Sequence, residues 1–167
     1  MQSFSLPLLA DYRRPIVELD GIRTLIDTGA IIPVFSMPGR VVEKMLGGEK
    51  ILSHKAFGGF GGSCYGDVYA LKNFCFGKLV FRRFEVFVPE DNLLTFPYLL
   101  PATAFWGLVY AFDTKAAQMV VTVPDDEPLE REFCIKDLNG KLYAQLNGVL
   151  IQEQSIFLQG LEVGVLA

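Results

Sequence analysis

Short apolar runs separated by turn-forming residues recur along most of the chain. The first two, residues 15–19 and 22–26, flank Asp20-Gly21, a dipeptide typical of two-residue hairpin turns. The pattern therefore predicts a β-hairpin whose second strand leads directly into Asp27.

A short helix is predicted after this hairpin. Pro38 suits the first helical turn, because proline has no N–H to leave unpaired there, and Gly47-Gly48 ends the helical pattern. Between them, apolar residues recur at helical spacing on one face: Val41, Val42, Met45 and Leu46. The stretch predicts a helix of about two turns.

Longer apolar stretches dominate the middle of the chain. They predict strands at 31–35, 67–76, 78–88, 93–100 and 117–123. The uncharged stretch 93–112 is also about as long as a membrane span, but Pro97, Pro101 and Gly107 interrupt any continuous helix through it. We therefore expect no membrane span, and interpret 102–111 as a short buried helix.

The composition changes at 124–128, where two prolines flank three acidic residues. Beyond this break, apolar runs are separated by Asn-Gly dipeptides, which favour tight hairpin turns and predict a β-meander. The dipeptides are Asn139-Gly140 and Asn147-Gly148. We predict one domain over 1–124 and a C-terminal meander over 125–167, packed either on the same domain or in a subunit interface.

Composition supports a mainly β protein with a sizeable core. Hydrophobic residues make up 51% of the chain and the mean hydropathy is +0.33, which excludes disorder and leaves apolar surface for a subunit contact. The formal net charge is −4 and no basic block is present, so nucleic acid is not an expected partner. The predicted class is mainly β, with a closed or barrel-like sheet and one or two short helices.

Cysteine and histidine are too sparse for a disulfide framework or a metal centre. Cys64, Cys75 and Cys134 are odd in number and widely spaced, and His54 is the single histidine. The N-terminus lacks the pattern of a secretory signal. We expect a cytoplasmic protein with three reduced thiols, no metal site and no cofactor.

Asp27 is unusual because it places a carboxylate at the end of an apolar strand. Burying a carboxylate is costly unless it is paired or hydrogen-bonded. Thr28, Gly29 and Ala30 follow, so a short hydroxyl and an unobstructed backbone N–H lie beside it. These residues leave two roles open: a structural carboxylate that caps the following turn, or a catalytic group.

About thirty residues later, the chain becomes rich in glycine. The residues are Phe57, Gly58, Gly59, Phe60, Gly61 and Gly62. Glycines at a hairpin tip present backbone amides and allow bending, which suits a lid over an extended peptide. The alternatives are a mobile surface hairpin and a phosphate cradle, although the Lys-Ser/Thr step of phosphate loops is missing. His54 lies nearby and could tune a pH response, but it has no evident partner in the sequence, so we expect an exposed bystander.

Residues 25–30 and the glycine pattern at 58–62 together resemble the retropepsin family of retroviral-type aspartic proteases. The resemblance covers about residues 15–124. The chain departs from the family pattern at Ile31, where many relatives carry serine, and at Pro101–Thr103, where an apolar-glycine step is usual.

The resemblance implies a retropepsin-like closed β-barrel with a flap hairpin, and an aspartic endopeptidase acting on an extended polypeptide. Asp27 is the implied catalytic residue, and Thr28, Gly29 and Ala30 would support its loop. Residues 57–62 would form the substrate-binding flap, and no metal would take part.

A single Asp-Thr-Gly implies a homodimer, because an aspartic protease needs two carboxylates that share one proton. Asp113-Thr114 is followed by lysine and is interpreted as a solvated turn. In this family the chain ends usually form the dimer sheet, which points to residues 1–12 or 149–167. The alternative is a catalytically silent retropepsin-like dimer that binds peptide or protein.

Overall fold

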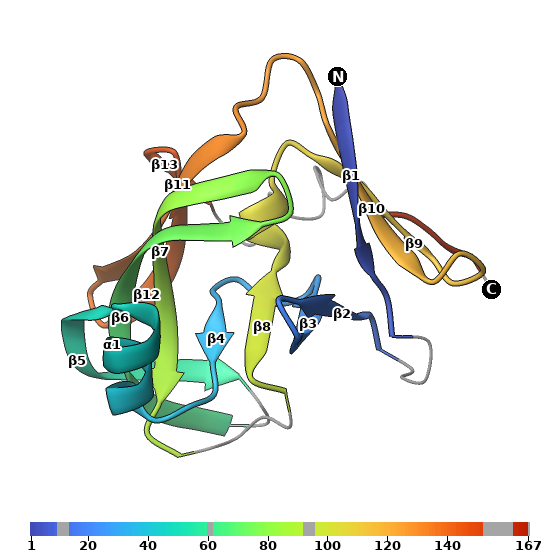
Figure 1. Cartoon of the computed structure of the whole chain (residues 1–167). Coiled ribbons are helices and arrows are strands. Elements are labelled where there is room, and N and C mark those ends of the chain that lie inside the picture. Colours follow the sequence, from blue (N-terminus) through green and yellow to red (C-terminus); the bar gives the residue numbers. More distant parts are fainter. Residues whose placement is uncertain (10–13, 60–61, 92–95, 152–161, 167) are drawn as a thin grey trace.

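Strands dominate the fold, as the sequence predicts. The computed structural model describes residues 1–9, 14–59, 62–91, 96–151 and 162–166. Within them, two sheets are present, one of four and one of ten strands. The small sheet has the order β1 (Gln2–Pro7), β10 (Gln118–Val123), β9 (Val109–Asp113) and β14 (Glu162–Leu166), so the first and last strands share it (Figure 1).

The large sheet carries the candidate site. Its path runs β13 (Val149–Ile151), β12 (Lys141–Leu146), β11 (Glu130–Leu138), β7 (Leu79–Pro89), β4 (Val34–Phe35), β8 (Tyr98–Pro101), β3 (Ile22–Asp27) and β2 (Ile16–Leu19). A long hairpin, β5 (Glu49–Gly59) with β6 (Gly62–Phe76), joins this sheet through β7. The closure of the sheet into a barrel stays a prediction.

The predicted β2–β3 hairpin is confirmed, and its turn explains where Asp27 lies. Asp20 and Gly21 have φ angles of 50° and 79°, the left-handed pair that a tight hairpin turn requires. β3 pairs with β2 on one side and runs parallel to β8 on the other, with Asp27 opposite Pro101. The strand therefore delivers Asp27 from the interior of the sheet.

The predicted helix is also present, as α1 (Gly39–Leu46), but its buried face was overestimated. Pro38 precedes it and Gly47, at φ 66°, ends it. Val42 is fully buried, whereas Met45 is 77% exposed. The helix contacts the sheet mainly through β6, and Val42 is its one buried residue.

The helix predicted at 102–111 is wrong. Only a single 3-10 turn, η1 (Ala102–Phe105), is present, and β9 begins four residues later. Gly107, at φ 81°, reverses the chain between them, and pairing with β10 then holds the segment extended. The strand predicted at 31–35 shrinks to Val34–Phe35. In the described parts of the chain, no helix has the length and apolar character needed to cross a membrane.

The C-terminal meander is confirmed for the strands that the structure describes. Both Asn-Gly dipeptides form left-handed turns, and β11 runs parallel to β7, so the meander extends the large sheet. Phe133 and Leu142 of the meander belong to the same hydrophobic cluster as Leu25 and Phe35. The division into units at residue 124 stays a prediction.

Candidate active site

The backbone that follows β3 holds the Asp27 side chain. The N–H of Gly29 donates to Asp27 Oδ1 at 3.0 Å, and the N–H of Ala30 donates to the Asp27 carbonyl at 3.1 Å. The Asp27 side chain is 30% exposed, so it is anchored and still open to solvent. The backbone N–H predicted beside the carboxylate is therefore present, and it belongs to Gly29.

The two places where the sequence departs from the family pattern contact each other. The hydroxyl of Thr103, fully buried in η1, donates to the Ile31 carbonyl at 2.6 Å. The β3–β8 pairing adds a second link, so the Asp27 loop is tied both to the end of β8 and to η1, which follows it. A buried hydroxyl with a satisfied partner is typical of a stable support.

Arg131 continues this support from below, and the sequence reading missed it. Its side chain is the largest fully buried one, with Nη1 3.2 Å from the Ala104 carbonyl and Nη2 3.2 Å from Glu127 Oε2. Burial lowers the pKa of this guanidinium, and Glu127 counters part of that shift. The strand alternation could have revealed it, because Arg131 has the same parity as the buried Phe133 and Ile135.

Arg14 is the arginine that lies beside the Asp27 carboxylate. Arg14 Nη2 lies 3.8 Å from Asp27 Oδ2, with the Arg14 side chain 61% exposed. Thr28 and Ala30 are half-buried and Ala30 packs on the core, while their predicted roles around the catalytic loop stay predictions.

The glycine-rich segment forms the end of the β5–β6 hairpin. Gly59 pairs with Gly62, while Phe60 and Gly61 lie outside the described residues. The Phe57 ring lies 5.4 Å from that of Phe87. The Phe87 N–H in turn donates to the Pro33 carbonyl at 2.9 Å, in the segment that follows the Asp27 loop. A chain of contacts therefore connects the hairpin with the candidate site.

Two glycines of this hairpin differ in their surroundings. A Cβ on Gly58 would meet nothing within 4 Å, whereas one on Gly66 would lie 2.4 Å from the Val88 carbonyl oxygen and 2.7 Å from the Phe87 ring. Close packing against β7 therefore requires glycine at position 66. Here, midway along β5–β6, β6 leaves its pairing with β7, and we call this point the base of the free hairpin. At Gly58, nearer the tip, there is room for a side chain, so packing does not require glycine there.

From the sequence we expect no metal site. Among the described residues, no group of three or more His, Cys, Asp or Glu side chains could hold a metal ion. Cys64, Cys75 and Cys134 are free thiols. Burial raises the pKa of Cys64 and of Cys134, which makes them poor nucleophiles.

The fold is similar to that of a solved retropepsin-like aspartic protease from Rickettsia conorii. The two chains are 14% identical, the similarity covers 73% of this chain and 91% of that chain, and the TM-score is 0.50. No family model and no curated protein matches the sequence. The likeness confirms the predicted mainly β, retropepsin-like fold.

Proposed function

We propose that this protein is an aspartic endopeptidase that hydrolyses peptide bonds in an extended polypeptide, with one Asp27 from each chain of a homodimer. One observation carries the proposal. Asp27 ends β3, which is paired on both sides, its carboxylate accepts the Gly29 N–H, and it stays partly exposed in a fold similar to that of an aspartic protease.

The chemistry requires two carboxylates close together. Their mutual repulsion lets one remain charged and activate a water molecule, while the other keeps a proton and polarises the scissile carbonyl. Asp113 is no substitute within the chain, because it ends β9 in the small sheet and lysine, not glycine, follows Asp113-Thr114. The second carboxylate would therefore come from a two-fold partner.

The small sheet is the proposed dimer contact. It contains both β1 and β14, and β1 forms one of its edges. An edge strand offers unpaired backbone groups to a second chain. The peptide substrate would bind as an extended strand beside the β5–β6 hairpin, whose glycines present backbone amides.

The Arg14–Asp27 contact favours a second candidate, a silent binding dimer. A guanidinium near the carboxylate supplies a counter-charge in the place of a second, proton-sharing carboxylate. Such a protein would bind peptide without cutting it.

A mixing experiment separates these functions. Purified protein is incubated with a diverse peptide pool between about pH 4 and 7, where dyad chemistry operates. The total protein concentration is kept constant while an increasing fraction of it is replaced by Asp27→Asn and the subunits are allowed to exchange. If each site needs one carboxylate from each chain, activity falls as the square of the unmutated fraction. A linear fall would contradict the shared site. No cleavage by a folded dimer would favour the silent binder.

A further inference from the structure

Two adjacent residues at the base of the β5–β6 hairpin bind acidic groups on two different neighbours. His54 Nδ1 lies 2.6 Å from Oε1 of Glu90, directly after β7. Lys55 Nζ lies 2.7 Å from Oδ2 of Asp137, on β11. The hairpin is therefore attached by charged groups to the strand beside it and to the C-terminal meander.

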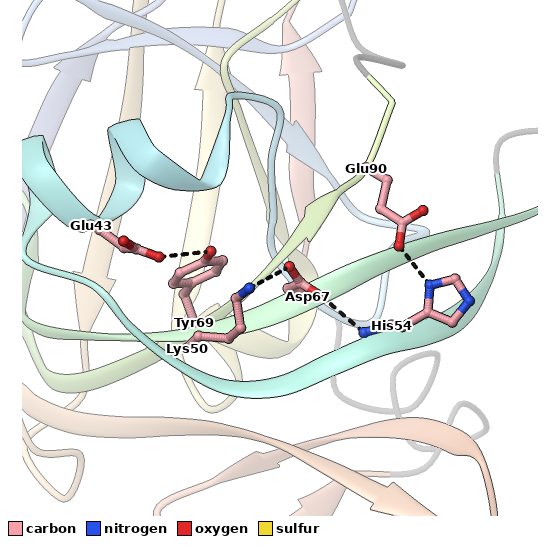
Figure 2. Close-up of polar contacts among 6 residues, drawn as sticks. All are labelled: Glu43, Lys50, His54, Asp67, Tyr69 and Glu90. Carbon is pink, nitrogen blue, oxygen red and sulfur yellow. Dashed lines mark hydrogen bonds and ion pairs between the residues drawn. The ribbon is translucent and has the colours of Figure 1, made fainter.

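A β-bulge directs His54 toward Glu90. The β5–β6 register shifts between Leu52 and Lys55, and His54 has a left-handed φ of 50°. Bulges of this kind turn a side chain out of the regular alternation. His54 is thereby directed away from the ladder and toward the end of β7, as Figure 2 shows.

Asp67 on β6 holds this bulge in place. Its Oδ1 accepts the His54 backbone N–H at 2.9 Å, and its Oδ2 lies 3.2 Å from Lys50 Nζ (Figure 2). The hydrogen bond to Asp67 raises the pKa of Lys50. One carboxylate therefore ties together both sides of the register shift.

The imidazole has a defined position against Tyr65. The two rings stack with centroids 4.5 Å apart and planes 4° from parallel. The Glu90 N–H donates to the Tyr65 carbonyl at 2.9 Å, so the same residue also positions the acid. The His54 and Glu90 side chains are 66% and 48% exposed, which leaves protons free to exchange with water.

We propose that His54 and Glu90 form a pH-dependent clamp, which holds the base of the β5–β6 hairpin while His54 is protonated and loosens it when the proton is lost. The inference rests on the proposed function in treating this hairpin as the cover of a peptide cleft. Under that function, the clamp would favour a closed cover in the mildly acidic range.

Several charged and titratable groups surround the His54–Glu90 contact. Those in contact with His54 are Tyr65 and Asp67 on β6 and Glu90 after β7, and Lys50 on its own strand pairs with Asp67. Histidine is the side chain that ordinarily changes charge between about pH 5 and 8, whereas carboxylates and ammonium groups keep theirs. The clamp is thus an ion pair while the imidazole carries its proton, and at most a weaker, neutral hydrogen bond once the proton is lost.

The neighbouring contact between Lys55 and Asp137 contains no histidine. The hydrogen bond from Lys55 lowers the pKa of Asp137 below its ordinary value of 3.8. Asp137 therefore stays charged between about pH 5 and 8. The hairpin is held by two charged contacts in mild acid and by one at neutral pH.

Amide hydrogen exchange of the full-length protein tests the clamp directly. Protection of the hairpin amides, corrected for intrinsic rates, is compared at about pH 5.5 and 7.5. We expect protection to fall about two- to five-fold on going to the higher pH, the scale of an exposed ion pair. Because His54 is the only histidine, its NMR signal reports the protonation state without ambiguity.

Matched variants identify the contact. Glu90→Gln should abolish the pH-dependent fall, because a glutamine contact with the imidazole has no charge partner at either pH. Glu43→Gln is the control, since Glu43 accepts from Tyr69 on the same face and does not contact His54 (Figure 2). It should keep the fall. Asp137→Asn should lower protection equally at both pH values.

The clamp would be overturned by an undiminished fall in Glu90→Gln, or by constant protection in the unmutated protein while the His54 signal titrates. The measurement involves no cleavage, so its failure is separate from that of the proposed function. A working clamp in a protein that cuts no peptide would contradict the protease alone. Cleavage without a clamp would contradict this inference alone.

Discussion

The support beneath Asp27 and the β5–β6 hairpin are built from different kinds of contact. Beneath Asp27, the polar links are made by buried groups, with Thr103 and Arg131 at 0% and 1% exposure. At the hairpin, the His54–Glu90 contact is open to water and the Lys55–Asp137 contact is half-buried. Buried polar links cost several kcal/mol to break, whereas exposed ion pairs contribute about 0–1 kcal/mol.

This difference indicates that the Asp27 loop is held rigidly, whereas the β5–β6 hairpin is held more weakly. Under the proposed function, Asp27 would meet a second copy of itself and would need a rigid position, which buried hydrogen-bonded links favour. A cover over a peptide must open and close, which weak contacts allow. The predictions below test this difference, from the largest expected effect to the smallest.

Asp27→Asn should lower cleavage at least about a thousand-fold, because the amide can neither share the proton nor activate water. The thermal unfolding midpoint should change little, since Asn can still accept the Gly29 N–H. Peptide cleavage and calorimetry measure the two effects. Retained cleavage would contradict the role of Asp27, and a large loss of stability would make it structural.

Arg131→Met should lower the free energy of unfolding by about 2–4 kcal/mol, because it leaves the Ala104 carbonyl without its donor and Glu127 without its cation. Denaturant unfolding measures this. Arg82→Met is the matched control, since Arg82 pairs with Glu130 at an exposed site on the same sheet. An equal effect of both variants would show that burial of Arg131 is unimportant.

Gly66→Ala should destabilise the protein by about 1–3 kcal/mol, as overpacking does, since the new methyl group would press on the Val88 carbonyl and Phe87. Gly58→Ala lies in open space and should be close to neutral. Thermal unfolding of the pair locates the boundary between the packed base and the open end of the hairpin. Similar losses from both would remove that boundary.

Asp137→Asn should have the smallest effect and a specific pH dependence. Because the pKa of Asp137 is lowered in the folded protein, its contribution is complete above about pH 4 and is lost as pH falls through the lowered value. The unmutated protein should therefore lose stability more steeply in strong acid than the variant. Parallel acid titrations of both proteins would contradict this contact.

Sequence reasoning succeeded where a few neighbouring residues decide the backbone. Asp20-Gly21 and the two Asn-Gly dipeptides specify left-handed turns, and all three hairpins are present. It failed at 102–111, where a uniformly apolar stretch is compatible with a helix or a buried strand. Pairing of β9 with β10 decided between them, and this pairing is a property of the assembled sheet.

The candidate site divides in the same way. The residues of the Asp27 loop and of the glycine-rich hairpin are recognisable in the sequence because their chemistry depends on adjacent residues. Their supports are not, since Thr103 and Ile31 are 72 positions apart and His54 and Glu90 are 36 apart. Local sequence alone determined the turns and the position of Asp27 at a strand end. Only the tertiary structure decided which distant side chains meet, because those contacts depend on how the strands are paired and packed.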